Sequence, residues 1–322
     1  MTTLIQIAVL DDYQGIAGDY AQWDALAGRA QVTFYRDHID DPGALVDRLL
    51  PYDVVCVMRE RTPLTAPLLG KLPRLKLIVT TGMRNASLDI AYANAQGIVV
   101  CGTGSGHTGT PQLVWLHILA HARHFQQESA DLRQGRWQTT VGRDLSGATL
   151  GIVGLGRVGT HVARVGNAFG MNVIAWSPNM TAERASAAGA EFVSKQALFQ
   201  RSDYVVIAMQ LRESTRNIVG NAELALMKPD AFLVNTSRAG LVDEAALVDA
   251  LRGGRIAGAG LDVFDPEPLP ENHVYRSLPN VILTPHIGYV TEQNYALFYR
   301  ETVENILAWL DNAPVRVLTG QE

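Results

Sequence analysis

Three polar residues with chemical potential lie where apolar, strand-forming segments end. Arg238 follows AFLVNTS, Glu267 lies between two prolines in DVFDPEPLP, and His286 follows VILTP. A histidine whose pKa is near neutral can give a proton to a carbonyl oxygen, and a nearby carboxylate stabilises its protonated form. An arginine can bind a substrate carboxylate through two parallel hydrogen bonds and polarise the adjacent carbonyl. Such a set would suit the interconversion of a 2-oxo acid and a 2-hydroxy acid.

Each of these residues has an ordinary alternative when it is taken alone. Arg238 could pair with a surface carboxylate, Glu267 could be a solvated loop residue, and His286 could lie in a simple turn. In an open α/β sheet, ligands bind beyond the carboxyl ends of the strands, where all three residues are expected. The set as a whole, rather than any single member, therefore predicts a catalytic site.

A glycine-rich turn, GLGRVG, predicts a binding site for the dinucleotide cofactor that this chemistry needs. It follows an apolar strand candidate and opens a helical segment, which is the context in which Gly-x-Gly-x-x-Gly binds a dinucleotide. Gly154 permits the tight turn, Gly156 lets the backbone approach a pyrophosphate, and Gly159 allows the helix to pack closely on the strand. Arg157 and Val158 lie in the same turn and are expected to border the cofactor. A glycine turn without a ligand is the alternative.

Ser177 is the residue expected beside the adenosine ribose. The fingerprint predicts an acidic side chain about 20 positions after the glycines, and AWSPN places a serine there. A carboxylate that would repel a 2′-phosphate is therefore missing, and so is an arginine at 178 or 179 that would attract one. Arg184 is the nearest arginine. The sequence thus permits either NAD or NADP as the cofactor.

The elements that must position these residues are short, continuous apolar runs that alternate with helical segments. Continuous runs, unlike alternating ones, are typical of parallel strands covered on both faces. The strand candidates are 4–10, 53–58, 75–81, 97–102, 149–154, 172–176, 204–209, 231–237, 257–264 and 280–284. These are too many for one comfortable sheet, and 322 residues fit about two domains. The expected fold class is α/β, with two doubly wound parallel-sheet domains.

A glycine-rich connector at 102–111, GTGSGHTGTP, marks the expected boundary between the domains. A long apolar helix is predicted directly after it, over 112–125. A second long helix, amphipathic and capped by Thr291, is predicted over 291–312. The N-terminal MTTLIQIAVLDD predicts a first strand and not a signal peptide.

Composition disfavours several functional classes. The chain is 47% hydrophobic and 18% charged, and its net charge of −5 argues against a nucleic-acid partner. Its apolar runs all fall short of the ~20 residues that a membrane span needs. The two cysteines, Cys56 and Cys101, make no disulfide framework, so a reducing cytoplasm is the expected location. His117 and His121 lack the glutamate of an HExxH zinc site, so we expect packing or interface histidines and no metal.

Four segments together resemble the D-isomer-specific 2-hydroxyacid dehydrogenases. They are LGIVGLGRVG, LMKPDAFLVNTSRAGLVDEAAL, AGAGLDVFDPEPLP and NVILTPHIG, in the order and spacing of that family, within a match that covers nearly the whole chain. The resemblance implies an oxidoreductase in which His286 is the acid/base, Glu267 supports it and Arg238 binds the substrate carboxylate. It also implies that Asp262 contacts the nicotinamide carboxamide.

The same resemblance implies the architecture and further cofactor contacts. A Rossmann cofactor domain, residues 105–292, would be inserted into a flavodoxin-like substrate domain made of residues 1–104 and 293–322. Thr236 and Ser237 would lie along the cofactor crevice.

A substrate loop is expected in TTGMRNASLD, at Thr81, Gly82, Met83 and Arg84. Many relatives have a plainer turn without an arginine here, so Arg84 either reaches an anionic group on the substrate or points to water. Arg59 and Arg61 in MRERTPLT resemble the arginines that phosphoglycerate-type members offer to a phosphate. The alternative is that both arginines are solvated loop residues.

Homodimers joined through the cofactor domains are the assembly that the resemblance implies. They would place the helix at 111–125 and RQGRWQ at 133–138 near the interface.

Two other functional classes stay open. A dinucleotide-sensing binding protein of the corepressor type would bind cofactor without turnover, and a methyltransferase with the same glycine turn would leave the Arg–Glu–His set unexplained.

Overall fold

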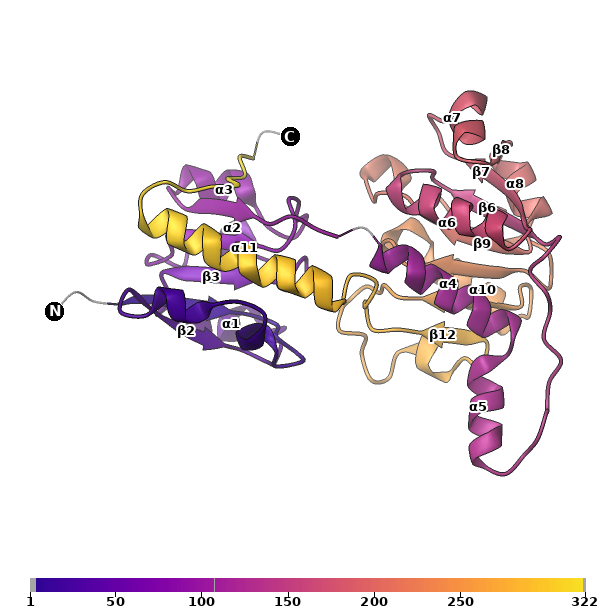
Figure 1. The fold of residues 1–322 in the computed structure, drawn as a ribbon, viewed down its shortest axis with the longest axis horizontal. Helices are drawn as coiled ribbons and strands as arrows, with labels where there is room; N and C mark the ends of the chain where they lie inside the picture. Colours follow the sequence, from indigo (N-terminus) through magenta and orange to yellow (C-terminus); the bar gives the residue numbers. More distant parts are fainter. Residues whose placement is uncertain (1–3, 107, 321–322) are drawn as a thin grey trace. The chain divides into compact units, whose positions relative to one another are not determined.

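The computed structural model describes residues 4–106 and 108–320. The first three residues of the predicted N-terminal strand segment, His107 of the predicted connector and residues 321–322 lie outside this range. The chain divides into two compact units, the first made of residues 1–106 and 291–322 and the second of residues 107–290. Each unit is built around its own parallel sheet (Figure 1).

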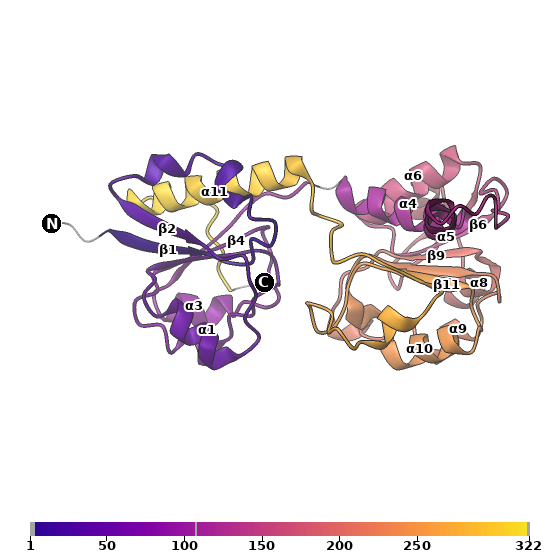
Figure 2. The ribbon, with the colours of Figure 1, turned by 90° about the horizontal axis from the view of Figure 1, so that it is seen from below.

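The first unit contains a five-stranded sheet in the order β2-β1-β3-β4-β5, with every neighbouring pair parallel. Its strands are β1 (Ile5–Val9), β2 (Ala30–Phe34), β3 (Val54–Val57), β4 (Leu77–Thr80) and β5 (Val99–Gly102). Its helices are η1 (Ala17–Asp19), η2 (Trp23–Leu26), α1 (Pro42–Leu49), α2 (Ala66–Leu69), α3 (Ile90–Ala95) and α11 (Glu292–Leu310). In Figure 2, α11 lies on one face of this sheet and α1 and α3 lie on the other. Both faces are covered, which explains why β3 and β4 are buried throughout and why β3 and all but the last residue of β4 are apolar.

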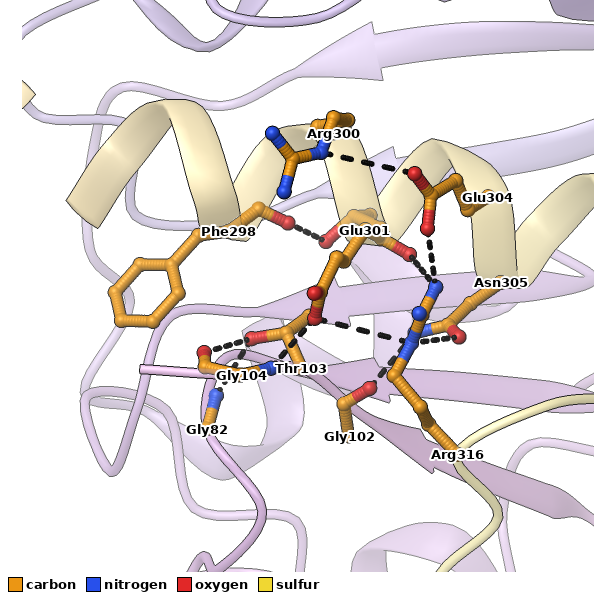
Figure 3. Close-up of polar contacts among 11 residues, drawn as sticks. Gly82, Gly102, Thr103, Gly104, Phe298, Arg300, Glu301, Glu304, Asn305 and Arg316 are labelled. Atoms are coloured by element: carbon orange, nitrogen blue, oxygen red, sulfur yellow. Dashed lines mark hydrogen bonds and ion pairs between the residues drawn. The ribbon is translucent and has the colours of Figure 1, made fainter. Parts of the chain in front are cut away.

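Helix α11 fixes the end of β5 to the C-terminal segment of the first unit (Figure 3). The amide of Gly104 donates to Glu301 Oε2 at 2.5 Å, and Asn305 Nδ2 donates to the carbonyl oxygen of Gly102 at 2.8 Å. Arg316 Nε in turn donates to Asn305 Oδ1 at 3.0 Å. The first residues of the predicted connector are therefore held by side chains of α11, and Thr291 caps that helix as expected.

The second unit contains a seven-stranded parallel sheet in the order β12-β11-β10-β9-β6-β7-β8. Its strands are β6 (Thr149–Val153), β7 (Asn172–Trp176), β8 (Glu191–Phe192), β9 (Tyr204–Ile207), β10 (Phe232–Asn235), β11 (Gly258–Leu261) and β12 (Val281–Leu283). Its α-helices are α4 (Gly109–Ala122), α5 (Phe125–Arg133), α6 (Arg157–Ala168), α7 (Ala182–Ala187), α8 (Lys195–Arg201), α9 (Asn221–Leu224) and α10 (Glu244–Arg252). Short 3₁₀ turns are η3 (Glu213–Thr215), η4 (Ala239–Leu241) and η5 (Val274–Ser277).

A hydrophobic core lies on each face of the second sheet. Helices α4 and α6 cover one face and α9 and α10 the other (Figure 2). Val114 and Ile118 of α4 pack in the first core, and Leu247 of α10 packs in the second. Burial on both faces of the sheet explains the continuous apolar runs of its strands. The predicted α/β class with two parallel sheets is confirmed.

Three details of the element prediction were wrong. Strands β2 and β8 were missed, because β2 is only partly buried and β8 has two exposed residues, so neither has a fully apolar run. The helix predicted over 112–125 ends at Ala122. His124 adopts a left-handed conformation, with φ of 48°, and this breaks the helix before α5 begins.

Candidate active site

Three neighbouring strands of the second sheet end at the same level and present the polar residues of the candidate site. Strand pairing aligns Asn235 of β10 with Leu261 of β11, and Leu261 with Leu283 of β12. Asp262 comes one residue after β11, while Arg238 and His286 each come three residues after their strands. All three residues therefore emerge at the carboxyl edge of the sheet, where α/β proteins bind ligands.

His286 and Glu267 form a direct hydrogen bond. His286 Nδ1 lies 2.6 Å from Glu267 Oε2, and Glu267 Oε1 accepts from the amide of Phe264 at 2.8 Å. The side chains are 19% and 25% exposed, so solvent reaches both only in part. Because Glu267 binds Nδ1, it leaves Nε2 as the ring nitrogen that can exchange a proton. The backbone of His286 has φ of 52°, a conformation that persists only when its surroundings hold it.

Asp262 holds the turn that carries His286. Its carboxylate accepts from the amides of Ile287 at 2.8 Å and Gly288 at 2.9 Å, and from the hydroxyl of Thr284 at 2.6 Å. The side chain is fully buried, and this burial raises the pKa of Asp262 although the three hydrogen bonds act in the opposite direction. Both carboxylate oxygens are thus already bonded to residues 284–288, which we call the histidine turn. The sequence did not reveal this role of Asp262.

The segment after β10 is braced from within. Asn235 is buried, donates through Nδ2 to the carbonyl oxygen of Arg238 at 2.9 Å, and accepts from the amide of Ser237 at 3.1 Å. Ser237 also donates through Oγ to Ile207 at 2.9 Å, and Arg238 Nη1 donates to the carbonyl oxygen of Ser237 at 2.6 Å. The hydroxyl of Thr236 is buried without a hydrogen-bond partner among the described residues. Asn235 was missed, and its only signal was a polar residue at the end of FLVN.

Packing within the protein explains two of the three glycines in the glycine turn, Gly154 and Gly159, but not Gly156. A Cβ at Gly154, where φ is 99°, would lie 2.6 Å from the carbonyl oxygen of Ala208, and a Cβ at Gly159 would overlap the carbonyl oxygen of Gly154. A Cβ at Gly156 would meet no described atom within 4 Å. Gly156 is also the N-cap of α6, and none of the described side chains caps that helix. This open helix terminus fits the pyrophosphate of a dinucleotide.

Other predicted cofactor residues lie around the same turn. Arg157 and Val158 are the first two residues of α6, and Ser177 follows β7. The amide of Gly154 donates to the carbonyl oxygen of Trp176 at 2.8 Å, so the glycine turn and the end of β7 are adjacent. Arg184 folds back on this segment, because its Nη1 donates to the carbonyl oxygen of Asn179 at 3.1 Å.

The predicted substrate residues gather at the carboxyl edge of the first sheet. Arg59 follows β3, has φ of 54°, and donates from its amide to Thr81 Oγ1 at 2.9 Å. Gly82 donates from its amide to Thr103 Oγ1 at 2.8 Å, while Met83 is 48% exposed and Arg84 is exposed. Asn85, which the sequence did not single out, joins the two segments by donating to the carbonyl oxygen of Arg59 at 2.6 Å.

His117 and His121 are both inside the second unit. His117 lies 3.1 Å from Thr284 Oγ1, and the ring of His121 stacks on Phe232 with ring centroids 4.0 Å apart. Over residues 4–106 and 108–320, no cluster of three histidine, cysteine or acidic side chains could hold a metal ion. Within the same residues, no helix combines the length and the apolar character needed to cross a bilayer.

The parallel sheet with its glycine turn and the polar residues at the strand ends are typical of an oxidoreductase that binds a dinucleotide. Residues 115–288 match the NAD binding domain of the D-isomer specific 2-hydroxyacid dehydrogenases. The chain belongs to that family, whose members act on CH–OH groups with a nicotinamide cofactor. The family predicted from the four sequence segments is therefore confirmed.

Individual relatives agree with this assignment. The chain is 38% identical over 252 residues to a glyoxylate reductase of Aeropyrum pernix, covering 75% of each chain. It is 35% identical over 272 residues to a D-3-phosphoglycerate dehydrogenase of Synechocystis sp., covering 83% of this chain but 49% of the relative. It thus spans about half the length of that curated relative. A crystal structure of phosphoglycerate oxidoreductase from Vibrio cholerae o395 superposes with a TM-score of 0.91 at 36% identity, over 96% of this chain and 100% of the other.

Proposed function

We propose that this chain interconverts a small 2-oxo acid and the corresponding D-2-hydroxy acid, with His286 as the acid/base. The observation that carries the proposal is the 2.6 Å hydrogen bond between His286 Nδ1 and Glu267 Oε2 at the carboxyl edge of the second sheet. A histidine paired in this way can hold a proton on Nε2 and deliver it to a carbonyl oxygen.

Each residue of the set has a defined task in this proposal. Glu267 fixes the ring through Nδ1 and stabilises its protonated form. In the reductive direction, Nε2 of His286 gives its proton to the oxygen of the 2-oxo group; in the oxidative direction it takes that proton back. Arg238 binds the substrate carboxylate with its guanidinium group and so orients the carbonyl. The bound nicotinamide supplies or accepts the hydride.

The two units take different tasks in the same proposal. Residues 107–290 hold the cofactor, with Gly154, Gly156 and Gly159 at the pyrophosphate and Asp262 toward the nicotinamide. The first unit, residues 1–106 and 291–322, supplies the substrate loop. Its residues Thr81, Gly82, Met83, Arg84 and Arg59 lie at the carboxyl edge of its own sheet, as a loop that contacts a ligand should.

The substrate is proposed to be one of the small acids that name the relatives: glyoxylate, which is a 2-oxo acid, or a phosphorylated three-carbon 2-hydroxy acid. Arg59 and Arg84 would favour the phosphorylated acid, because a guanidinium group binds phosphate oxygens well. The cofactor is proposed to be NAD or NADP. Ser177 offers no charge to repel a 2′-phosphate, and Arg184 is held close to the segment after Ser177.

A homodimer is proposed through α5 and the segment after it. These residues extend away from their own sheet (Figure 1) and carry exposed apolar side chains, with Phe125 61%, Trp137 76% and Val141 91% exposed. Several exposed, large apolar side chains on one segment favour a protein–protein interface there. A solution mass of one chain would contradict this part of the proposal.

A reducing cytoplasm is proposed as the location, supported by Cys56 and Cys101, which are buried and carry free thiols.

A substrate and cofactor panel tests the proposed reaction. The protein is mixed with NADH or NADPH and with glyoxylate, hydroxypyruvate, pyruvate or phosphohydroxypyruvate, and the absorbance of the reduced nicotinamide is followed. We expect turnover of at least one acid, lost in His286→Ala. Cofactor binding without turnover above the His286→Ala control would contradict the proposal and favour a dinucleotide-sensing binding protein. Binding of S-adenosylmethionine without nicotinamide binding would favour a methyltransferase.

A further inference from the structure

A chain of hydrogen bonds connects helix α4 to the turn that carries His286. His117 Nε2 lies 3.1 Å from Thr284 Oγ1, and Thr284 donates to Asp262 Oδ1 at 2.6 Å. Asp262 in turn accepts from the amides of Ile287 and Gly288, the two residues after His286. Every member of this chain belongs to the second unit.

The direction of these hydrogen bonds can be deduced from their chemistry. The carboxylate of Asp262 only accepts, so the single hydroxyl proton of Thr284 must point toward it. Thr284 Oγ1 therefore accepts from His117, which requires a proton on His117 Nε2. His117 Nδ1 is buried without a hydrogen-bond partner among the described residues, and an unprotonated nitrogen tolerates this better than an N–H group. Burial also lowers the pKa of His117 to about 4, so the ring is neutral near pH 7.

The packing holds this imidazole in place. His117 is fully buried, and a Cβ on Gly260 of β11 would lie 2.8 Å from its ring. The glycine in the strand therefore makes the space in which the imidazole lies. The first turn of α4 contacts the same loop, because Thr110 Oγ1 donates to the carbonyl oxygen of Gly288 at 3.1 Å. Helix α4 thus contacts both ends of the histidine turn: His117 contacts Thr284, and Thr110 contacts Gly288.

We propose that His117 is a positioning residue for His286. It acts through Thr284 and Asp262: by fixing the hydroxyl proton of Thr284, it completes the bonds of Asp262 and so holds the left-handed turn at His286. Fixing this turn sets the direction of His286 Nε2. The inference rests on the proposed function, in which His286 is the acid/base.

His121 provides a matched control on the same helix. It lies one turn after His117, burial lowers its pKa to about 4, and its Nδ1 also has no partner among the described residues. Its ring stacks on Phe232 instead of contacting the histidine turn. Replacing either histidine by leucine removes an imidazole whose Nδ1 is buried, but only His117→Leu breaks the hydrogen-bond chain.

Steady-state kinetics of the full-length protein separate positioning from packing. With the best 2-oxo acid, His117→Leu should lower kcat by about 10-fold or more, because small misplacements of a catalytic group are costly. The KM for the cofactor should stay within about 2-fold. His117→Gln, which puts an amide N–H where Nε2 was, should restore most of the loss, and His121→Leu should keep kcat within about 3-fold. Equal losses in His117→Leu and His121→Leu, or no rescue by glutamine, would overturn the proposal.

NMR spectroscopy tests the same chain without relying on turnover. In uniformly ¹⁵N-labelled protein at about pH 7, His117 should be neutral with its proton on Nε2. The backbone amide signals of Ile287 and Gly288 should move in His117→Leu and stay in place in His121→Leu. A proton on Nδ1, or unmoved amide signals in His117→Leu, would overturn the proposal. If the wild-type protein reduces no 2-oxo acid, the proposed function fails; if it is active and these signals do not move, only the role of His117 fails.

Discussion

His286 Nδ1 lies 2.6 Å from Glu267 Oε2 although 19 positions separate the two residues in the chain. The pair forms because β11 and β12 are neighbours, so the loop after one strand meets the turn after the other. The second oxygen of Glu267 is held by the amide of Phe264 at 2.8 Å. The carboxylate is therefore oriented by its own loop before it contacts the imidazole.

Glu267→Gln should lower kcat strongly while the protein stays folded. Glutamine keeps the shape of the side chain but removes the negative charge that stabilises a protonated His286. We expect a loss of roughly 10²-fold in kcat, the scale of an acid–base contribution. Initial rates at saturating substrate check this. Glu271→Gln, an exposed glutamate of the same loop, is the control; equal rates for the two variants would show that the pair has no catalytic role.

Gly156→Ala and Gly159→Ala should separate cofactor binding from folding. A Cβ at Gly156 has free space in the protein, so Gly156→Ala should keep its melting temperature but bind the cofactor about 10-fold more weakly. A Cβ at Gly159 would overlap the carbonyl oxygen of Gly154, so Gly159→Ala should melt several degrees lower, as for a loss of about 1–3 kcal/mol. Thermal melts and cofactor titrations measure both effects. Undiminished cofactor binding by Gly156→Ala would argue against a pyrophosphate at this turn.

Ser177→Asp should change the cofactor preference. A carboxylate at this position would accept hydrogen bonds from the ribose hydroxyls of NADH and repel the 2′-phosphate of NADPH. The ratio of kcat/KM for NADH over NADPH should rise by at least about 10-fold, as expected for a repulsion of about 1–2 kcal/mol. Ser177→Asn, similar in size but uncharged, is the comparison. A ratio that changes equally in both variants would place the 2′-hydroxyl elsewhere.

His38 should make the stability of the first unit depend on pH. Its Nδ1 lies 2.9 Å from Oδ1 of the buried Asp11, and this hydrogen bond, opposed by burial, raises the pKa of His38. A raised pKa in the folded state means stability that is present below the unfolded pKa of about 6.5 and is lost as the pH rises through the folded value. The free energy of unfolding should thus drop more on His38→Gln at about pH 6 than at about pH 9.

Urea unfolding of the wild-type protein and of His38→Gln at about pH 6 and about pH 9 measures how the free-energy cost of the substitution depends on pH. His161→Gln, at a half-buried histidine of α6, reports what loss of a histidine outside the His38–Asp11 pair does. A cost of His38→Gln that is the same at both pH values, or larger at the higher one, would contradict the expected linkage.

The sequence predicted most of the fold because burial on both faces leaves a simple record. Strands such as β4 and β10 are buried at every position and apolar except at their last residue, and the segments after such strands supplied the candidate residues. Some residues with a role that depends on approach in three dimensions were not predicted. His117 and Thr284 are 167 positions apart, and nothing in the helix around His117 indicates its partner. Asn235 and Thr284 likewise looked like ordinary strand-end residues, because their importance comes from the loops that they brace.

A double-variant cycle on His286→Gln and Glu267→Gln tests the central claim most directly. If the carboxylate acts only through the imidazole, kcat of the double variant should equal that of His286→Gln within about 3-fold, because the second change removes nothing further. If the two losses instead multiply, Glu267 acts independently of His286, and the account of the site as an acid/base pair is wrong.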